Sequence, residues 1–208
     1  MTVVARALPL LVLPLIAVGC EKRAVVLGFW FEDVAFASPN LGGALSRADL
    51  QVIETVAREE LAIAFRDLDL VLTDKRDARY RVRVVQELFG NPLTRKSSVA
   101  GESRNIPLMG AFGAVNLTYF ASGAIVFSPA GTSRPELLAA IGRGLGRGAA
   151  HEFAHQLISA DLHATRDRGS YEYLAASRVE QYYGPMHWTI AGPLLKKRYG
   201  RPQFASRP

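Results

Sequence analysis

The chain has 208 residues, of which 49% are hydrophobic, 9% aromatic and 21% charged. This length is suited to one domain with a single core, and the composition excludes a disordered or low-complexity protein. Its net charge is +6, and much of the basic excess lies from residue 196 onward, at Lys196-Lys197-Arg198, Arg201 and Arg207. We expect this basic tail to be a solvated helix end, with contact to anionic lipid or cell-wall polymer as the alternative.

The first residues are typical of an export signal. Met1 to Arg6 carries one positive charge and leads into an apolar run, residues 7–18, that contains two prolines. A membrane-spanning helix needs about 20 apolar residues, so this shorter run is a poor permanent anchor. We therefore predict a signal peptide over residues 1–19 that is removed on export.

Directly after this run, Ala17-Val18-Gly19-Cys20 resembles the bacterial lipobox, although that pattern prefers a branched aliphatic residue where Ala17 stands. Cys20 is also the only cysteine, so it cannot form an internal disulfide. The resemblance implies lipidation of Cys20 and a protein tethered to the membrane of a bacterial cell envelope, with plain secretion as the alternative. The mature domain would span residues 20–208, and an exported chain without a binding motif is not expected to bind nucleic acid.

The first half of this domain alternates strand and helix patterns. Residues 24–31 form an apolar run that predicts a buried strand. Residues 46–65 repeat apolar side chains at helical spacing after Ser46, which is a suitable N-cap. Two further strands are predicted at 69–73 and 80–88, the second of them half-exposed.

The next stretch predicts a loop, two strands and a long helix. Residues 90–113 are rich in Gly, Pro, Ser and Asn and are expected to form a surface loop that rims a cleft. Short apolar runs at 115–120 and 123–127 predict strands, either of which could be an edge strand above the cleft. A helix is expected from Pro135 to Ile158, held by packing because it contains Gly142, Gly144, Gly146 and Gly148.

This last helix contains the sequence His151-Glu152-Phe153-Ala154-His155. Residues four apart lie on the same face of a helix, so His151 and His155 can both bind one metal ion. Glu152 lies beside them, where a carboxylate can take a proton from a metal-bound water. The pattern therefore predicts a zinc site with Glu152 as the catalytic base.

With this HExxH motif the chain resembles the zincin metallopeptidases, and the metzincins in particular. Metzincins extend the motif to HExxHxxGxxH, and Asp161 stands at the position of the third ligand. Ile158 replaces the glycine that lets the metzincin chain turn sharply, so the chain is expected to turn later and to bring His163 to the metal. We favour His163 as third ligand, with Asp161 as the alternative; a distant acid, Glu172 or Glu180, would instead resemble gluzincins.

The resemblance extends to Gly184-Pro185-Met186-His187-Trp188, which is similar to the metzincin Met-turn. In astacin-like relatives a Tyr that approaches the metal follows two residues after the Met, whereas this chain has Trp188 there. The candidates to replace that Tyr are Tyr171, Tyr173, Tyr182 and Tyr183.

Together these features predict an α+β fold: one zincin-like domain in which a mixed, twisted sheet packs on a backing helix and the HExxH helix, followed by helix and loop. The predicted activity is zinc-dependent hydrolysis of peptide bonds in a peptide or protein substrate. The alternatives are a metal-binding or degenerate peptidase without activity, and a zinc amidase or peptidase that acts on cell-wall peptides.

Overall fold

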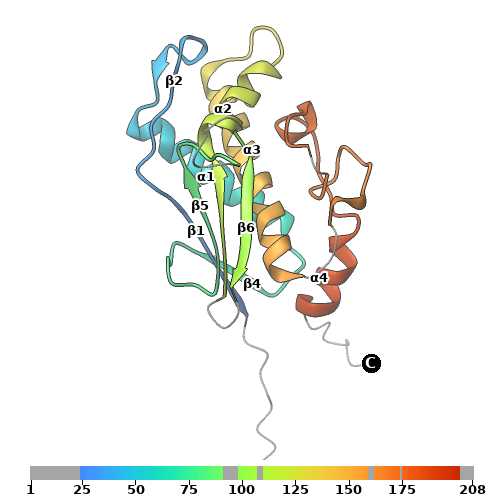
Figure 1. The fold of residues 1–208 in the computed structure, drawn as a ribbon. Coiled ribbons are helices and arrows are strands. Elements are labelled where there is room, and N and C mark those ends of the chain that lie inside the picture. Colours follow the sequence, from blue (N-terminus) through green and yellow to red (C-terminus); the bar gives the residue numbers. More distant parts are fainter. Residues whose placement is uncertain (1–23, 91–97, 107–109, 159–161, 174, 202–208) are drawn as a thin grey trace, which may run out of the picture.

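The computed structural model describes residues 24–90, 98–106, 110–158, 162–173 and 175–201. Within these ranges the chain combines a five-stranded mixed sheet with four α-helices, so the predicted α+β class is confirmed (Figure 1). The predicted signal peptide over 1–19, Cys20 and Asp161 lie outside the described residues.

The sheet has the strand order β4-β1-β5-β7-β6. Its strands are β1 (Val25–Phe31), β4 (Leu70–Thr73), β5 (Tyr80–Val85), β6 (Gly101–Ile106) and β7 (Gly110–Asn116). The first four strands in this order run parallel, and β6 pairs antiparallel with β7 at the edge. A separate two-stranded ladder joins β2 (Ala37–Ser38) to β3 (Gly43–Ala44) around a 3-10 turn, Pro39–Leu41.

The connection from β4 to β5 crosses β1, because these two strands flank β1 in the sheet. It passes directly over Gly28, where a Cβ atom would lie 2.3 Å from the carbonyl oxygen of Lys75. No residue with a side chain fits at this position without displacing the crossing segment.

Four helices accompany the sheet: α1 (Arg47–Ala64), α2 (Leu117–Val126), α3 (Arg134–Leu157) and α4 (Ala191–Tyr199). As predicted, Ser46 caps α1, and the carboxylate of Asp49 accepts a hydrogen bond from the backbone N–H of Ser46. None of the helices in the described ranges has both the length and the apolar character needed to cross a membrane.

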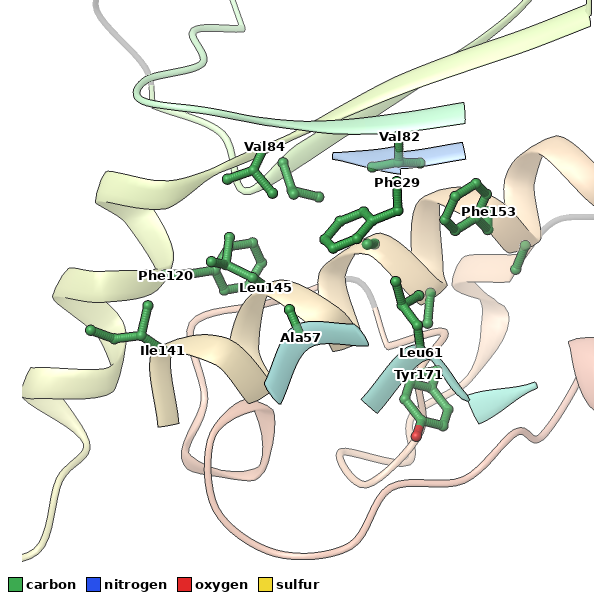
Figure 2. Packing of buried hydrophobic residues seen from close by; sticks show 14 of the residues in the cluster. Phe29, Ala57, Leu61, Val82, Val84, Phe120, Ile141, Leu145, Phe153 and Tyr171 are labelled. Atoms are coloured by element: carbon green, nitrogen blue, oxygen red, sulfur yellow. The ribbon is translucent and has the colours of Figure 1, made fainter. Parts of the chain in front are cut away.

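The core lies between the sheet and the pair α1 and α3. Phe29 and Val82 from the sheet meet Leu61 of α1 and Phe153 of α3, all 1% exposed or less, and Figure 2 shows this packing. Val25, Leu27, Phe29 and Phe31 pack in or against this core, so burial explains every second residue of the apolar run in β1.

The glycines of α3 lie where other parts of the fold approach the helix closely. A Cβ at Gly142 or Gly146 would lie 2.7 or 2.5 Å from a backbone carbonyl oxygen of α1. On the other side, Gly144 packs on the ring of Tyr182 and Gly148 on that of Phe120. The helix is therefore clamped from two sides, which compensates for its low intrinsic propensity.

Two sequence predictions between residues 90 and 127 are wrong. The predicted loop contains β6 and most of β7. Gly101, Gly110 and Gly113 made this stretch resemble a loop, but they lie in strands where neighbouring atoms leave no space for a Cβ atom. The predicted strands at 115–120 and 123–127 are instead the end of β7 and helix α2. The α2 sequence buries Leu117, Phe120, Ala121 and Ala124, a helical spacing that its β-branched and aromatic residues obscure.

Candidate metal centre

Two histidines at the end of α3 face each other across one helical turn. The Nε2 atoms of His151 and His155 lie 3.1 Å apart. Two nitrogens that each lie about 2.0–2.1 Å from one tetrahedral metal ion are separated by roughly 3.3 Å, so this pair has the spacing of two ligands.

His163 joins this pair from a 3-10 turn, Leu162–Ala164, that follows the helix. Its ring centroid lies 5.1 Å from that of His151 and 4.9 Å from that of His155. One ligand atom from each of the three residues lies within 4.8 Å of the others, so the group could bind a metal ion. At Ile158 the chain leaves α3 in an extended conformation, with φ −133° and ψ 143°, which agrees with a late return to the site.

The two distant acids lie in other environments. The carboxylate of Glu172 is buried and accepts hydrogen bonds from Thr189 N at 3.0 Å and from the backbone N–H of Ala191, the first residue of α4. Glu180 forms an ion pair with Arg168 at 3.0 Å. The structure thus brings His163 to the α3 histidines, whereas it gives Glu172 the role of holding the start of α4.

His151 is held in one orientation by the backbone. Its Nδ1 donates a hydrogen bond to the carbonyl oxygen of Tyr171 at 2.8 Å, which leaves Nε2 as the atom that faces the other histidines. Burial and the nearby His155 lower the pKa of His151 to about 4. The ring is therefore neutral at neutral pH, the form that binds metal.

The segment that carries the Tyr171 carbonyl is itself fixed by Arg178. This side chain is 1% exposed and donates to the carbonyl oxygens of Arg168 at 2.8 Å and Ser170 at 2.9 Å. From the other side, Tyr171 N donates to the carbonyl oxygen of His187 at 3.0 Å. Arg178 had no motif to identify it in the sequence, because its hydrogen-bond acceptors are all backbone carbonyl oxygens.

The predicted Met-turn lies in this supporting layer. Gly184 begins it with a left-handed φ of 102°, and Met186 packs partly buried against the core. His187 is exposed and bonds Asp167 at 2.8 Å, so it lies outside the histidine group. The segment contributes to the site by pairing with residues 169–171.

Glu152 is 7% exposed and lies beside the histidine group. Burial, with a smaller contribution from the charge of Glu102, raises the pKa of Glu152 to about 8. Its carboxylate occupies the space next to Gly101, where a Cβ atom would lie 2.5 Å from Oε1. In the metal-free protein this acid is protonated at neutral pH, and a cation bound nearby would favour its ionised form.

A cleft of about 710 Å³ opens over these groups. Strand β6 forms one wall, and residues of the ranges 171–173 and 175–181 form another. The Ser103 hydroxyl of β6 donates to the backbone carbonyl of Glu152 at 3.2 Å, which fixes this wall to α3. The edge strand at the cleft is therefore β6, and the predicted candidates at 115–120 and 123–127 are wrong.

Of the four candidate tyrosines, Tyr171 and Tyr173 line the cleft. The Tyr183 hydroxyl donates to the carbonyl of Ala124 at 3.2 Å, and Tyr182 packs against α2 and α3. Trp188 donates its indole N–H to the carbonyl oxygen of Ala64 at 2.7 Å, so that group is engaged at the end of α1.

Comparisons of the chain with protein-family models, with curated proteins and with solved structures give no match.

Proposed function

We propose that this chain is a zinc-dependent peptidase with a metzincin-like site. The observation that carries the proposal is the convergence of three imidazoles, from His151, His155 and His163, beside the buried carboxyl group of Glu152. Three nitrogen ligands suit zinc and leave a fourth position for water, as in catalytic rather than structural zinc sites. The arrangement of sheet, backing helix α1 and helix α3 is also that expected of a zincin-like domain.

In this proposal each residue has one task. His151, His155 and His163 hold the zinc ion, which when bound polarises a peptide carbonyl and lowers the pKa of a water molecule. Glu152 accepts the proton of the attacking water and donates it to the leaving amine. The Tyr171 carbonyl keeps His151 in the tautomer that presents Nε2.

The substrate we propose is an extended peptide. Strand β6 is the edge of the sheet beside the cleft, and an extended chain can pair with the backbone of such an edge. Gly101, Ser103 and Asn105 of β6 face α3, where Asn105 donates to the His155 carbonyl at 3.4 Å. A peptide bound along β6 would thus cross the cleft next to Glu152.

We further propose, from the signal-like N-terminus and Cys20, that the domain acts outside the cytoplasm while tethered by lipid to a bacterial membrane. This part of the proposal is carried by the sequence features alone.

The decisive experiment is the substitution Glu152→Gln, with Glu59→Gln on the exposed face of α1 as the matched control. Both proteins, loaded with zinc, are assayed on a panel of fluorogenic peptides, casein and cell-wall peptides. We expect the control to hydrolyse a substrate at the parent rate, and Glu152→Gln to bind zinc with hydrolysis reduced at least about 100-fold. A parent protein that binds zinc but hydrolyses nothing on the panel would overturn the proposal.

A further inference from the structure

The start of β1 and the end of α4 lie at the same end of the molecule. Val25 N donates to the carbonyl of Asp69 at 3.1 Å, and Asp69 N donates to the carbonyl of Tyr199 at 2.7 Å. Leu68 and Gly200 also form an antiparallel bridge. Figure 1 shows α4 and the start of β1 at this end and α2 at the opposite end.

This end, which we call the basal end, carries a surplus of exposed basic side chains. They are Arg66, Lys196, Lys197, Arg198 and Arg201. The acidic residues of the same segments are Asp67 and Asp69, so basic groups outnumber acidic ones. Beside them Val26 and Val71, paired in adjacent strands, are 40% and 49% exposed. Exposed apolar groups next to lysine and arginine suit the surface of an anionic bilayer.

The basal end is also the end to which Cys20 is joined. Cys20 precedes Ala24, the first described residue, by four positions, so the connecting segment spans at most about 14 Å. That segment, Glu21-Lys22-Arg23, adds two basic residues and one acidic residue. A lipid on Cys20 would therefore keep the basal end within about 14 Å of the bilayer surface. This distance is close to the roughly 8 Å over which charges interact in physiological salt.

We propose that the basal end docks on an anionic lipid bilayer, so that the lipid on Cys20 sets the distance and the basic residues set the orientation. This inference rests on the proposed lipid anchor and is independent of the proposed peptidase chemistry. It also places the end of α3 near the bilayer, because Arg198 and Tyr199 both donate to the Leu157 carbonyl, at 2.9 and 3.0 Å. The cleft would then meet peptides at the membrane surface.

The test uses the processed full chain with an environment-sensitive dye on a cysteine introduced at Val71, at the basal end. A second protein carries the dye at Val126, which is 74% exposed at the end of α2. Each is reconstituted into vesicles of phosphatidylcholine, with or without phosphatidylglycerol. We expect the dye at 71 to shift to the blue and to be quenched by headgroup spin labels when phosphatidylglycerol is present, and the dye at 126 to be unaffected.

Neutralising the lysines distinguishes docking from simple tethering. With Lys196→Gln and Lys197→Gln together we expect the docked population to fall roughly 25-fold, about five-fold per charge, as it should also do in high salt. Arg47→Gln, at the exposed start of α1, should leave docking unchanged. Hydrolysis of a soluble peptide should be the same in all these variants.

Three results would overturn the inference. One is an equal response of the dye at 71 with and without phosphatidylglycerol. Another is unchanged docking in the lysine variant, in which case the lysines only complement the carboxyl end of the α4 dipole. The third is labelling of Cys20 in the parent protein, which would show that the thiol carries no lipid and leave the peptidase proposal untouched.

Discussion

Gly101 and Glu152 share one small volume at the cleft. The carboxylate lies where a side chain at position 101 would project, and the atom nearest to such a Cβ is the end of the Glu152 side chain. A substitution at Gly101 can therefore be accommodated mainly by moving the carboxylate, because the nearest backbone atom, the carbonyl oxygen of Ala114, lies 3.2 Å away and has to shift by only a few tenths of an ångström. This makes the position a sensitive probe of where Glu152 must lie.

We predict that Gly101→Ala lowers kcat/KM of the proposed hydrolysis about 100-fold or more, with little change in zinc affinity or unfolding free energy. Steady-state kinetics and zinc titration of the same preparation measure both. Gly169→Ala is the control, because a Cβ there meets no atom closer than 3.4 Å. Unchanged kinetics in Gly101→Ala would contradict the assignment of Glu152 as the base.

The ionisation of Glu152 also predicts a dependence of stability on pH in the metal-free protein. Its pKa is raised from 4.5 to about 8, so the stability conferred by the neutral acid is complete below pH 4.5 and is lost as the pH rises through 8. Glu152→Gln cannot ionise and should gain stability relative to the parent over this range, by at most about 5 kcal/mol. Urea unfolding at pH 5 and pH 8 measures the gain, and Glu59→Gln should show none.

Among the helices, α3 is fastened to its neighbours by one buried ion pair. Arg147 of α3 bonds Glu60 of α1 at 3.0 and 3.2 Å, and both residues are less than 9% exposed. The same guanidinium donates to the carbonyls of Glu180 and Gly184, each at 2.9 Å. It thereby connects α1, α3 and the segment that supports the Tyr171 carbonyl.

Arg147→Met should lower the unfolding free energy by about 3–5 kcal/mol, because it leaves the Glu60 carboxylate buried without its partner. The double variant with Glu60→Gln should recover part of this loss, since no unpaired charge remains. Chemical denaturation of the parent, both single variants and the double variant measures the coupling. A double variant with the summed loss of the two singles would show that the pair does not act as a unit.

Across the molecule as a whole, the histidine group joins α3 to the chain that follows it. Two of its members end the helix, and His163 belongs to the 3-10 turn that leads into residues 162–173. A bound metal would therefore connect the sheet and helix half of the fold to the irregular C-terminal part. Stability and metal binding should be linked.

Zinc should raise the melting temperature of the protein, and chelation should reverse the increase. At a free zinc concentration about 100-fold above Kd the gain is about 2.7 kcal/mol. His163→Ala should lose most of this increase, while His187→Ala, which alters an exposed histidine outside the group, should keep it. Thermal unfolding with zinc and with chelator makes the comparison; an equal increase in His163→Ala would exclude His163 as a ligand.

The sequence by itself determined those features that depend on local spacing. The four-residue separation of His151 and His155 is a helical property, and the Ser46 cap and apolar rhythm of α1 are likewise local. The choice of His163 was a hypothesis from a missing glycine, and the structure brings that residue to the other two. The elements β1, α1, β4, β5 and α3 and the pairing of His151 with His155 could thus be predicted without any long-range contact, whereas the chemistry is a proposal.

Tertiary structure alone decided the rest, because it depends on contacts between distant segments. In the sequence Gly101 is typical of a loop, and only the folded chain shows that the Glu152 carboxylate fills the space beside it. For this reason β6 was not predicted as a wall of the cleft. Arg178 supports the site and Glu172 supports the start of α4, in both cases through hydrogen bonds with backbone groups. Such bonds leave no recognisable pattern in the sequence. The position of α4 beside the start of β1, and with it the basal end, follows only from the folded chain.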